Sequence, residues 1–300
     1  MYEAYYGLNG KPFAVPPDPS FLFVSPQYRA ALTMLEYGLV NSTLFMLLTG
    51  EVGAGKTLVV RDVISRIRGD MRVVLMTNTS HRLGTLLQWV CKACGIDTRQ
   101  QDDVELYQLF VAALEREQAA GRRLLLIVDE AQNLGVEVLE ELRVLSNVNV
   151  DKRLLFQTIL VGQPELREML KRPDLRQFVQ RIGVDYHLQP LSEQEAIGYV
   201  KHRLKVAGGN PELFSRSAVA LAHLHSGGIP RLINQLCELA LVYGYSAGLR
   251  SIGPDIMEHV IADRAAGGLF PGAVAAETAA PPPRSRWSET LRRMFPGAYS

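Results

Sequence analysis

The sequence predicts a doubly wound α/β domain followed by a smaller all-helical domain. Apolar runs typical of strands alternate with segments of helical periodicity as far as residue 189. The run 124–128 is apolar at every position, which is typical of a strand buried on both faces of a parallel sheet. From Pro190 onward the strand pattern stops and only helical patterns follow. These observations indicate a parallel sheet with helices on both faces and a helical unit after it.

The composition narrows the function classes. With 47% hydrophobic and 21% charged residues, the 300-residue chain has ordinary globular values and enough length for about two domains. Lys+Arg 32 against Asp+Glu 31 leaves a net charge of +1, which counts against a broad nucleic-acid-binding surface. The apolar runs are far shorter than a membrane-spanning helix, and the turn-rich start does not resemble a signal peptide. We therefore expect a cytoplasmic protein.

The first part of the chain predicts an arm and then the α/β core. Residues 1–27 combine many aromatic residues with prolines, so we expect an extended arm that wraps the core. A helix is predicted from Pro26 to the break at Asn41-Ser42. The core, taken as residues 28–189, then has predicted strands at 44–49, 72–77, 124–128, 155–161 and 183–188. Its later helices are predicted after residue 56 and at 83–94, 104–120, 136–145 and 166–178, the last with a kink or restart near Pro173.

The second part predicts a helical domain over residues 190–265. Ser192 and Glu195 form a capping-box pattern at its start. Its helices are predicted at 192–207, 216–225, 230–245 and 254–265. Residues 266–300 are rich in Gly, Ala and Pro, so we expect disorder with a short amphipathic helix near the end. The basic residues of this tail suggest contact with a partner or an anionic membrane surface, and a frayed end without function is the alternative: Arg284, Arg286, Arg292 and Arg293.

A phosphate-binding loop lies between the first strand and the following helix. It has the pattern G-x-x-x-x-G-K-[ST], with a strand-like run before it and a helix-like run after it, which is the context that makes this Walker A motif specific. Glycines let the backbone aim its N–H groups at phosphate oxygens, helped by the positive end of the helix. The lysine would reach the β- and γ-phosphates, and the threonine hydroxyl would bind Mg²⁺. The predicted ATP-binding residues are Gly50, Glu51, Val52, Gly53, Ala54, Gly55, Lys56, Thr57 and Leu58.

An acidic pair follows the run 124–128. Asp129 and Glu130 stand at the carboxyl end of this predicted strand, where α/β sheets place their sites. In this Walker B pattern Asp129 would hold Mg²⁺ together with Thr57, and Glu130 would activate the attacking water. The alternative is that Asp129 only caps the next helix. The two motifs together predict ATP hydrolysis.

Several motifs resemble the ExeA (GspA) family of AAA+ ATPases. They include Tyr6-Gly7-Leu8, Pro12-Phe13 and Pro17-Asp18-Pro19 near the start, Leu48-Thr49-Gly50-Glu51, Asp129-Glu130-Ala131-Gln132, Leu160-Val161-Gly162-Gln163-Pro164-Glu165-Leu166, and Gly228-Ile229-Pro230-Arg231-Leu232-Ile233-Asn234. The resemblance spans roughly residues 1 to 265. It implies the AAA+ P-loop fold, a five-stranded sheet of order 5-1-4-3-2, a helical lid, and assembly into rings or filaments.

The resemblance also assigns roles to further residues. Gln163 would be the sensor 1 group that contacts the γ-phosphate and the water, and Arg231 would be the sensor 2 group that ties the lid to the nucleotide. An Arg231 on the surface without a role is the alternative. Arg181 resembles an arginine finger that acts in a neighbouring subunit, and Arg176 competes for that role. Phe13, Pro17 and Tyr28 would either approach adenine or make core contacts only.

Two biological settings are consistent with such an ATPase. The resemblance implies a homo-oligomer that works with cell-envelope machinery in secretion, pilus biogenesis or polysaccharide export, with the tail as a peripheral contact to the inner membrane. Similar ATPases of the TniB/TnsC type are DNA-binding regulators of transposition, and these need a basic stripe on the assembled surface. The near-neutral charge favours the envelope setting.

Overall fold

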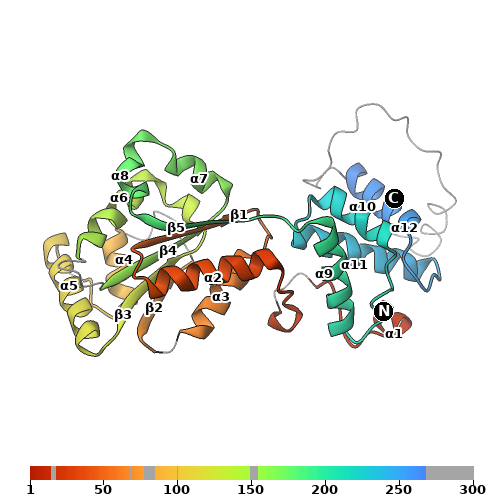
Figure 1. Cartoon of the computed structure of the whole chain (residues 1–300), viewed down its shortest axis with the longest axis horizontal. Helices are drawn as coiled ribbons and strands as arrows, with labels where there is room; N and C mark the ends of the chain where they lie inside the picture. The colour runs from red at the N-terminus through yellow and green to blue at the C-terminus, as the bar shows by residue number, and fades with distance from the viewer. Residues whose placement is uncertain (15–17, 68, 78–84, 100, 149–154, 268–300) are drawn as a thin grey trace.

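The computed structural model consists of a three-layer α/β core joined to a bundle of helices (Figure 1). It describes residues 1–14, 18–67, 69–77, 85–99, 101–148 and 155–267. A parallel sheet of five strands has the order β2-β3-β4-β1-β5, which confirms the predicted order. Its strands are β1 (Phe45–Gly50), β2 (Met71–Met76), β3 (Arg123–Val128), β4 (Phe156–Gly162) and β5 (Ile182–Leu188).

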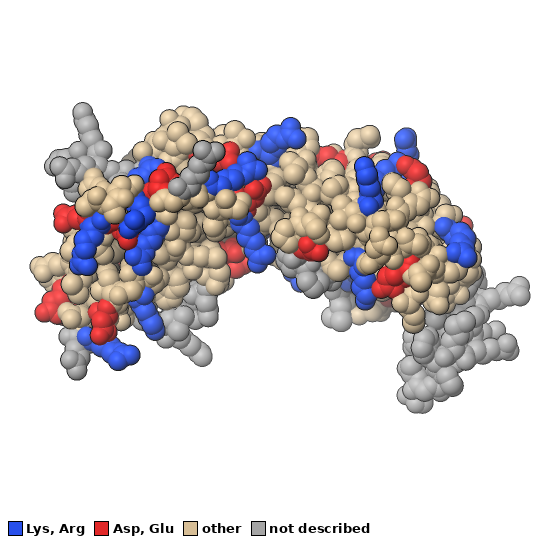
Figure 2. All heavy atoms as spheres, turned by 90° about the horizontal axis from the view of Figure 1, so that it is seen from below, with Lys and Arg blue, Asp and Glu red and all other residues tan. Residues whose placement is uncertain are grey.

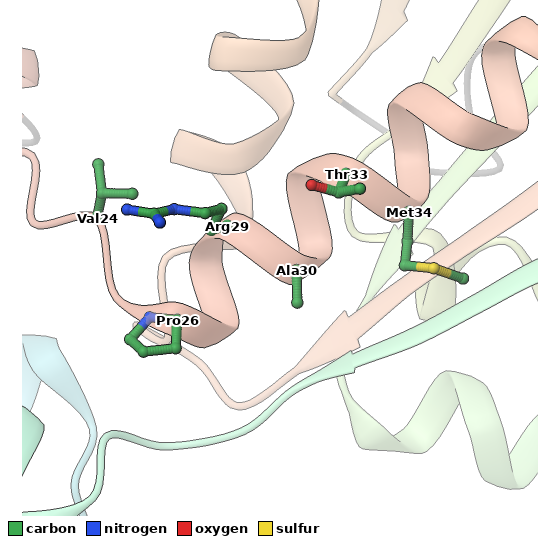
Figure 3. A pocket seen from close by; sticks show the side chains of 6 residues that line it. All are labelled: Val24, Pro26, Arg29, Ala30, Thr33 and Met34. Carbon is green, nitrogen blue, oxygen red and sulfur yellow. The ribbon is translucent and has the colours of Figure 1, made fainter.

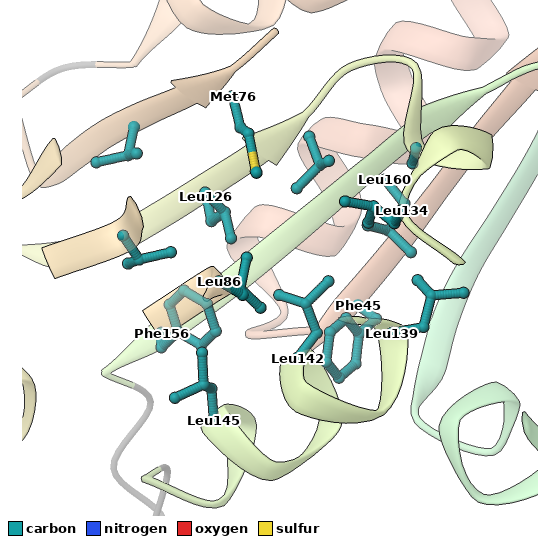
Figure 4. Close-up of a cluster of buried hydrophobic side chains, with 14 of the residues drawn as sticks. Phe45, Met76, Leu86, Leu126, Leu134, Leu139, Leu142, Leu145, Phe156 and Leu160 are labelled. Atoms are coloured by element: carbon teal, nitrogen blue, oxygen red, sulfur yellow. The ribbon is translucent and has the colours of Figure 1, made fainter. Parts of the chain in front are cut away.

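Alternation along the strands divides the core side chains between two faces. Phe45 and Leu47 of β1 face one hydrophobic cluster, while Met46 and Leu48 face the other. In the larger cluster, Phe45 and Phe156 pack beneath the sheet against leucines of the covering helices (Figure 4). The helices on this face are α4 (Leu86–Ala93), α5 (Asp103–Ala119), α6 (Gly135–Leu145), α7 (Pro164–Leu170) and α8 (Arg176–Val179). The long helix predicted over 166–178 is therefore divided, and its restart at Pro173 begins a 3-10 turn, Pro173–Leu175.

Two helices cover the opposite face of the sheet. They are α2 (Pro26–Val40) and α3 (Lys56–Arg66), whose apolar residues, among them Leu35 and Val63, fill the second cluster. Ser25 caps α2 by accepting the N–H of Tyr28, and Pro26 occupies its first position. Because α3 follows β1 after only five residues, it begins at the carboxyl edge of the sheet. That position places its amino end beside the ends of β3 and β4.

The helical part has its own hydrophobic core. It is formed by α9 (Glu193–Val206), α10 (Arg216–Ser226), α11 (Pro230–Ser246) and α12 (Pro254–Ala266), as predicted within a residue or two. The capping box at Ser192 and Glu195 is present at the start of α9. Among the described helices, none combines the length and apolar character that crossing a membrane requires.

The amino-terminal arm differs from the expected extended segment. Tyr2–Tyr6 forms a short helix, α1, which ends at Gly7 in the left-handed conformation. Instead of wrapping the α/β core, the arm packs against the helical part, where Tyr2, Tyr6 and Phe13 are buried in the same cluster as α9–α12 (Figure 1). Burial of one aromatic face against those helices stabilises a helix too short to form alone. The tail and its expected short helix lie outside the described residues.

Two chain segments cross between the core and the helical part. One leads from the arm into α2, and the other leads from β5 into α9. Gln27, in the first turn of α2, joins them on the core side: its side-chain oxygen accepts the N–H of Gln189 and its carbonyl accepts the hydroxyl of Tyr186. On the side of the helical part, which we call the lid, the N–H of Leu191 donates to the carbonyl of Gly228. The helical part is thus connected to the core by two chain segments, which hydrogen bonds at Gln27 and Leu191 hold in place.

Candidate functional site

The loop between β1 and α3 brings the predicted phosphate-binding residues from Val52 to Leu58 into one pocket, whereas Gly50 and Glu51 do not line it. This pocket, with a volume of about 530 Å³, is lined by the loop, Glu130, the arm and the lid helices. Gly53 and Gly55 have φ angles of 84° and 108°, a region that L-residues with side chains rarely adopt. α3 begins without a side-chain cap: the N–H of Leu58 donates to the carbonyl of Gly55, and the N–H groups of Lys56 and Thr57 before it receive no side-chain cap. The loop therefore has the backbone that a phosphate group needs.

Lys56 and Thr57 lie at the start of α3, facing the end of β3. Lys56 is buried, and its Nζ donates to the carbonyls of Gly50 (2.7 Å) and Glu51 (3.0 Å). Burial lowers the pKa of Lys56, while the nearby carboxylates of Glu130 and Asp129 oppose that shift. The hydroxyl of Thr57 lies 3.5 Å from Oδ2 of Asp129. A hydroxyl and a carboxylate at this separation are the hard oxygen donors that suit Mg²⁺.

The acidic pair follows β3 directly. The N–H of Asp129 donates to the carbonyl of Met76 at the end of β2, which continues the sheet pairing through this residue. Burial raises the pKa of Asp129, and the charge of Glu130 adds to that effect. Glu130 adopts the left-handed conformation, with φ 55° and ψ 41°, and is one of two described non-glycine residues with positive φ. Such a conformation is unfavourable for a glutamate and is found where surrounding contacts hold it in place.

Two glutamines hold the Glu130 carboxylate. Its Oε2 accepts the side-chain amide of Gln163 at 2.9 Å and that of Gln132 at 2.5 Å. The backbone N–H of Gln163 donates to the Oε1 of Gln132 at 3.1 Å, which closes the ring of contacts. Burial raises the pKa of Glu130, but the two amide donors and Lys56 outweigh it and lower the pKa overall. The carboxylate is therefore kept ionised and fixed in direction.

Arg231 connects the lid to the phosphate-binding loop. It is the second residue of α11, and its backbone N–H lies 3.4 Å from the carbonyl of Gly53. A Cβ atom at Gly53 would lie 2.5 Å from the Cβ of Arg231, so the two backbones approach as closely as a glycine allows. The side chain of Arg231 also lines the pocket. The lid helix α11 thus begins against the loop.

The arginine-finger candidates lie elsewhere. Arg181 precedes β5, at the sheet edge opposite the loop, and its guanidinium donates to the carbonyl of Arg143 and the side chains of Ser146 and Asn147. Arg176 begins the nearby α8. The structure does not bring either residue to the pocket of its own chain. Their assignment stays a prediction about a neighbouring subunit.

The aromatic residues of the arm and α2 have different positions. Phe13 is fully buried in the helical part, where its ring meets Phe214 edge-on at 5.7 Å. Tyr28 lines the pocket, and its hydroxyl contacts the carbonyl of Leu58 and the carboxylate of Asp62. Pro17 lies outside the described residues.

Seven polar residues at the site were not predicted as site residues from the sequence: Gln132, Asp18, Ser25, Gln189, Tyr199, Arg203 and Asn234. Gln132 was part of a recognised motif, but its role depends on a contact with Gln163, which is distant in sequence. Tyr199, Arg203 and Asn234 line the lid side of the pocket. Helical spacing contained a signal for Asn234, because it lies three residues after Arg231 on α11 and so shares its face. Tyr199 and Arg203 are four residues apart on α9, so they also share one face of their helix.

A second, more open groove of about 520 Å³ lies on the outer face of α2. Figure 3 shows it lined by Val24 and Pro26 at one end and Met34 at the other. Arg29 is its charged residue. None of the motif residues lines this groove, so it is separate from the site.

The sheet order, the loop after β1, the acidic pair after β3 and the helical lid define the AAA+ class of P-loop NTPase fold. A family model described as an AAA domain matches residues 40–170. Three solved structures share the fold. They are CDC6P from Pyrobaculum aerophilum (16% identity, 82% of this chain and 70% of that chain, TM-score 0.61), the ORC2 protein of Aeropyrum pernix (18%, 84% and 71%, 0.58) and the RuvB Holliday junction branch migration motor of Thermotoga maritima (17%, 84% and 73%, 0.51).

The sequence comparison is more specific. General secretion pathway protein A of Aeromonas hydrophila is 41% identical over 253 residues, which make up 84% of this chain and 46% of that protein. The chain is thus a relative of general secretion pathway protein A, and its predicted resemblance to the ExeA (GspA) type of AAA+ ATPase is confirmed. It spans about half the length of this curated relative.

Proposed function

We propose that the chain is a Mg²⁺-dependent ATPase whose lid moves with the nucleotide. The observation that carries the proposal is the convergence of Lys56, Thr57 and Asp129 with the clamped Glu130 at one sheet edge. Lys56 and the amino end of α3 would bind the phosphates, and Thr57 and Asp129 would hold Mg²⁺. When bound, Mg²⁺ would neutralise charge that develops on the transferred phosphoryl group.

The remaining residues have separate roles in this proposal. Glu130 takes a proton from the attacking water, because its carboxylate is ionised and directed by two amides. Gln163 links that carboxylate to the start of α7. Arg231 makes the position of the lid depend on the bound nucleotide through α11, since its backbone already contacts the loop at Gly53. Arg181 acts in the site of a neighbouring copy, with Arg176 as the alternative.

Two substitutions test the ATPase. Glu130→Gln removes the base and keeps the shape, so hydrolysis should fall by about 10²- to 10⁴-fold while ATP binding persists. Lys56→Ala should weaken ATP binding itself. Phosphate release and equilibrium binding of ATP distinguish the two effects. An unchanged turnover in Glu130→Gln would refute the proposed role of this residue.

Shared sites are tested by mixing variants. Arg181→Ala should spare ATP binding and lower the hydrolysis that depends on oligomers. A mixture of Arg181→Ala and Glu130→Gln subunits should recover activity, because some interfaces then combine an intact finger with an intact base. If the mixture with Arg181→Ala does not recover activity, but a mixture of Arg176→Ala and Glu130→Gln subunits does, the arginine finger is Arg176.

The setting we propose is cell-envelope work at the cytoplasmic side of the inner membrane. The similarity to a protein named general secretion pathway protein A supports this setting. Figure 2 shows basic and acidic side chains interspersed over one face of the molecule, without a continuous basic stripe. ATP-dependent binding to duplex DNA that is lost steeply with salt would favour the transposition type instead.

A further inference from the structure

The lid side of the pocket contains an unusual group of buried polar residues. Tyr199, Arg203 and Asn234 are 7%, 8% and 7% exposed, and all three line the same pocket as the phosphate-binding loop. We call them the lid wall. Tyr199 and Arg203 come from α9, and Asn234 comes from α11. None of them contributes to the hydrolysis proposed above.

The hydrogen bonds of the lid wall have a fixed direction. An arginine side chain can only donate, so the contact between Nη1 of Arg203 and the hydroxyl of Tyr199 (2.8 Å) makes the tyrosine oxygen the acceptor. The tyrosine proton is then donated to Oδ1 of Asn234, also at 2.8 Å. This order leaves the Nδ2 group of Asn234 as a donor. The same order leaves further donors on Arg203, namely the N–H groups that bind neither Tyr199 nor the carbonyl of Pro12.

The charge of Arg203 has one acidic group in its neighbourhood, the exposed Asp18, which lines the same pocket and interacts with it electrostatically. Within the part of the chain that the structure describes, Arg203 forms no ion pair closer than 4 Å. Aromatic rings surround it instead, with Phe21 at 4.9 Å and Tyr199 at 5.6 Å from ring centroid to Cζ. Burying a guanidinium is unfavourable unless acceptors compensate it. The lid wall therefore presents unused donors to the pocket and requires acceptors from what binds there.

The lid wall lies beyond the phosphate-binding end of the pocket. Arg231 contacts the loop at Gly53, and Asn234 follows it by three residues on α11. Phosphates held by Lys56 and Thr57 would leave the base as the part of a nucleotide that extends toward the arm and α9. In adenine the ring nitrogens N1, N3 and N7 are acceptors without a proton, whereas N1 of guanine carries a proton and donates. The adenine nitrogens match the groups that the lid wall leaves free, which are N–H donors of Arg203 and Asn234.

We propose that the lid wall selects the base of the nucleotide by donating hydrogen bonds to the ring nitrogens of a purine. This inference rests on the proposed function, since it needs the triphosphate to occupy the loop. Arg203 has a double role in it. The same guanidinium holds the arm through Pro12 and stacks on Phe21, so the arm becomes part of the base site.

The first test uses the unchanged protein. Affinities are measured for ATP, for its 1-deaza, 3-deaza and 7-deaza analogues, and for inorganic tripolyphosphate as a competitor without a base. Each analogue replaces one ring nitrogen by C–H. At least one should bind about tenfold weaker than ATP, because a buried donor then loses its acceptor. Equal affinities for ATP and all three analogues would overturn the inference.

The second test uses Asn234→Asp, which keeps the acceptor for Tyr199 and replaces the free donor by an acceptor. It should lower ATP affinity by about tenfold and leave tripolyphosphate competition unchanged. Asn210→Asp, at an exposed position before α10, is the matched control and should change neither. Equal losses for ATP and tripolyphosphate in Asn234→Asp would overturn the inference, because the wall would then act on phosphates or on folding. If the unchanged protein bound neither ATP nor tripolyphosphate, the proposed function itself would fail.

Discussion

The core side and the lid side of the pocket are built in different ways. On the core side, Lys56, Asp129 and Gln163 each stand at or just after the end of a strand or its loop, so backbone pairing in the sheet positions them. On the lid side, Tyr199, Arg203 and Asn234 are positioned by side-chain hydrogen bonds between two helices and the arm. The core side is therefore held by the fold itself, whereas the lid side depends on a few particular contacts. Substitutions in the two regions should have correspondingly different effects.

The largest expected effect tests whether the arm and lid form a unit separate from the core. Phe13 and Phe45 are both fully buried, one in the helical part and one under the sheet. Either change to Ala should cost about 3–5 kcal/mol of folding free energy. Phe13→Ala should reduce hydrogen-exchange protection in α1 and α9–α12, and Phe45→Ala should reduce it in the strands. Uniform loss of protection in both variants would show one cooperative unit and remove the contrast.

A smaller effect is expected where the two sides meet. In Gly53→Ala the new Cβ would lie 2.5 Å from Arg231, at a φ of 84°. Gly55→Ala is the matched control, since its φ of 108° is also unfavourable but no atom lies within 4 Å of the added carbon. Gly53→Ala should lose about 2 kcal/mol more nucleotide-binding free energy than Gly55→Ala, through displacement of α11. Equal affinities would mean that the loop and the lid are not coupled here.

The hydrogen bonds of Gln132 and Gln163 to the Glu130 carboxylate should affect the rate of hydrolysis more than the binding of ATP. Gln132→Met keeps the volume and removes both hydrogen bonds of the side chain, so Glu130 and Gln163 lose their common support. We expect kcat to fall about tenfold with KM unchanged, because the base is misdirected while the phosphate contacts remain. Gln118→Met, on α5 and outside the pocket lining, serves as the control. A rise in KM with constant kcat would contradict a positioning role.

The smallest expected effect concerns pH. Nδ1 of His187 forms a hydrogen bond with the hydroxyl of Thr49 (2.9 Å). Burial lowers the pKa of His187 from its ordinary value of 6.5, and the charge of Arg167 adds to that shift. Glu51 and Asp185 oppose it, and Lys56 reinforces it. The unfolded chain then binds the proton more readily, so folding stability should fall as pH drops below about 6.5. His187→Gln should flatten this loss in urea unfolding at pH 7.5 and 5.5. The same change at the exposed His259 should leave the loss in place.

Local motifs explain why the core side could be predicted. The loop at Gly50–Thr57 and the acids after β3 are contiguous patterns whose chemistry is specific, and the strand order followed from the resemblance. The lid wall could not be predicted in this way. Its contacts join Pro12, α9 and α11, and no local pattern records which helix faces meet. The short helix α1 was missed for the same reason, because its stability comes from packing against distant residues.

The attachment of the arm to the lid has a consequence for how the chain folds during synthesis. Tyr2 bonds to Glu238 across 236 residues, and Arg203 reaches Pro12 across 191. The arm leaves the ribosome before any of the core, but its partners in α9 and α11 are among the last described elements to appear. Because the chain is synthesised at about 5–20 residues per second, the aromatic residues of the arm stay without their native neighbours for roughly tens of seconds. The proposed base site, which needs both the arm and α9, therefore has its last residues synthesised after those of the phosphate-binding loop.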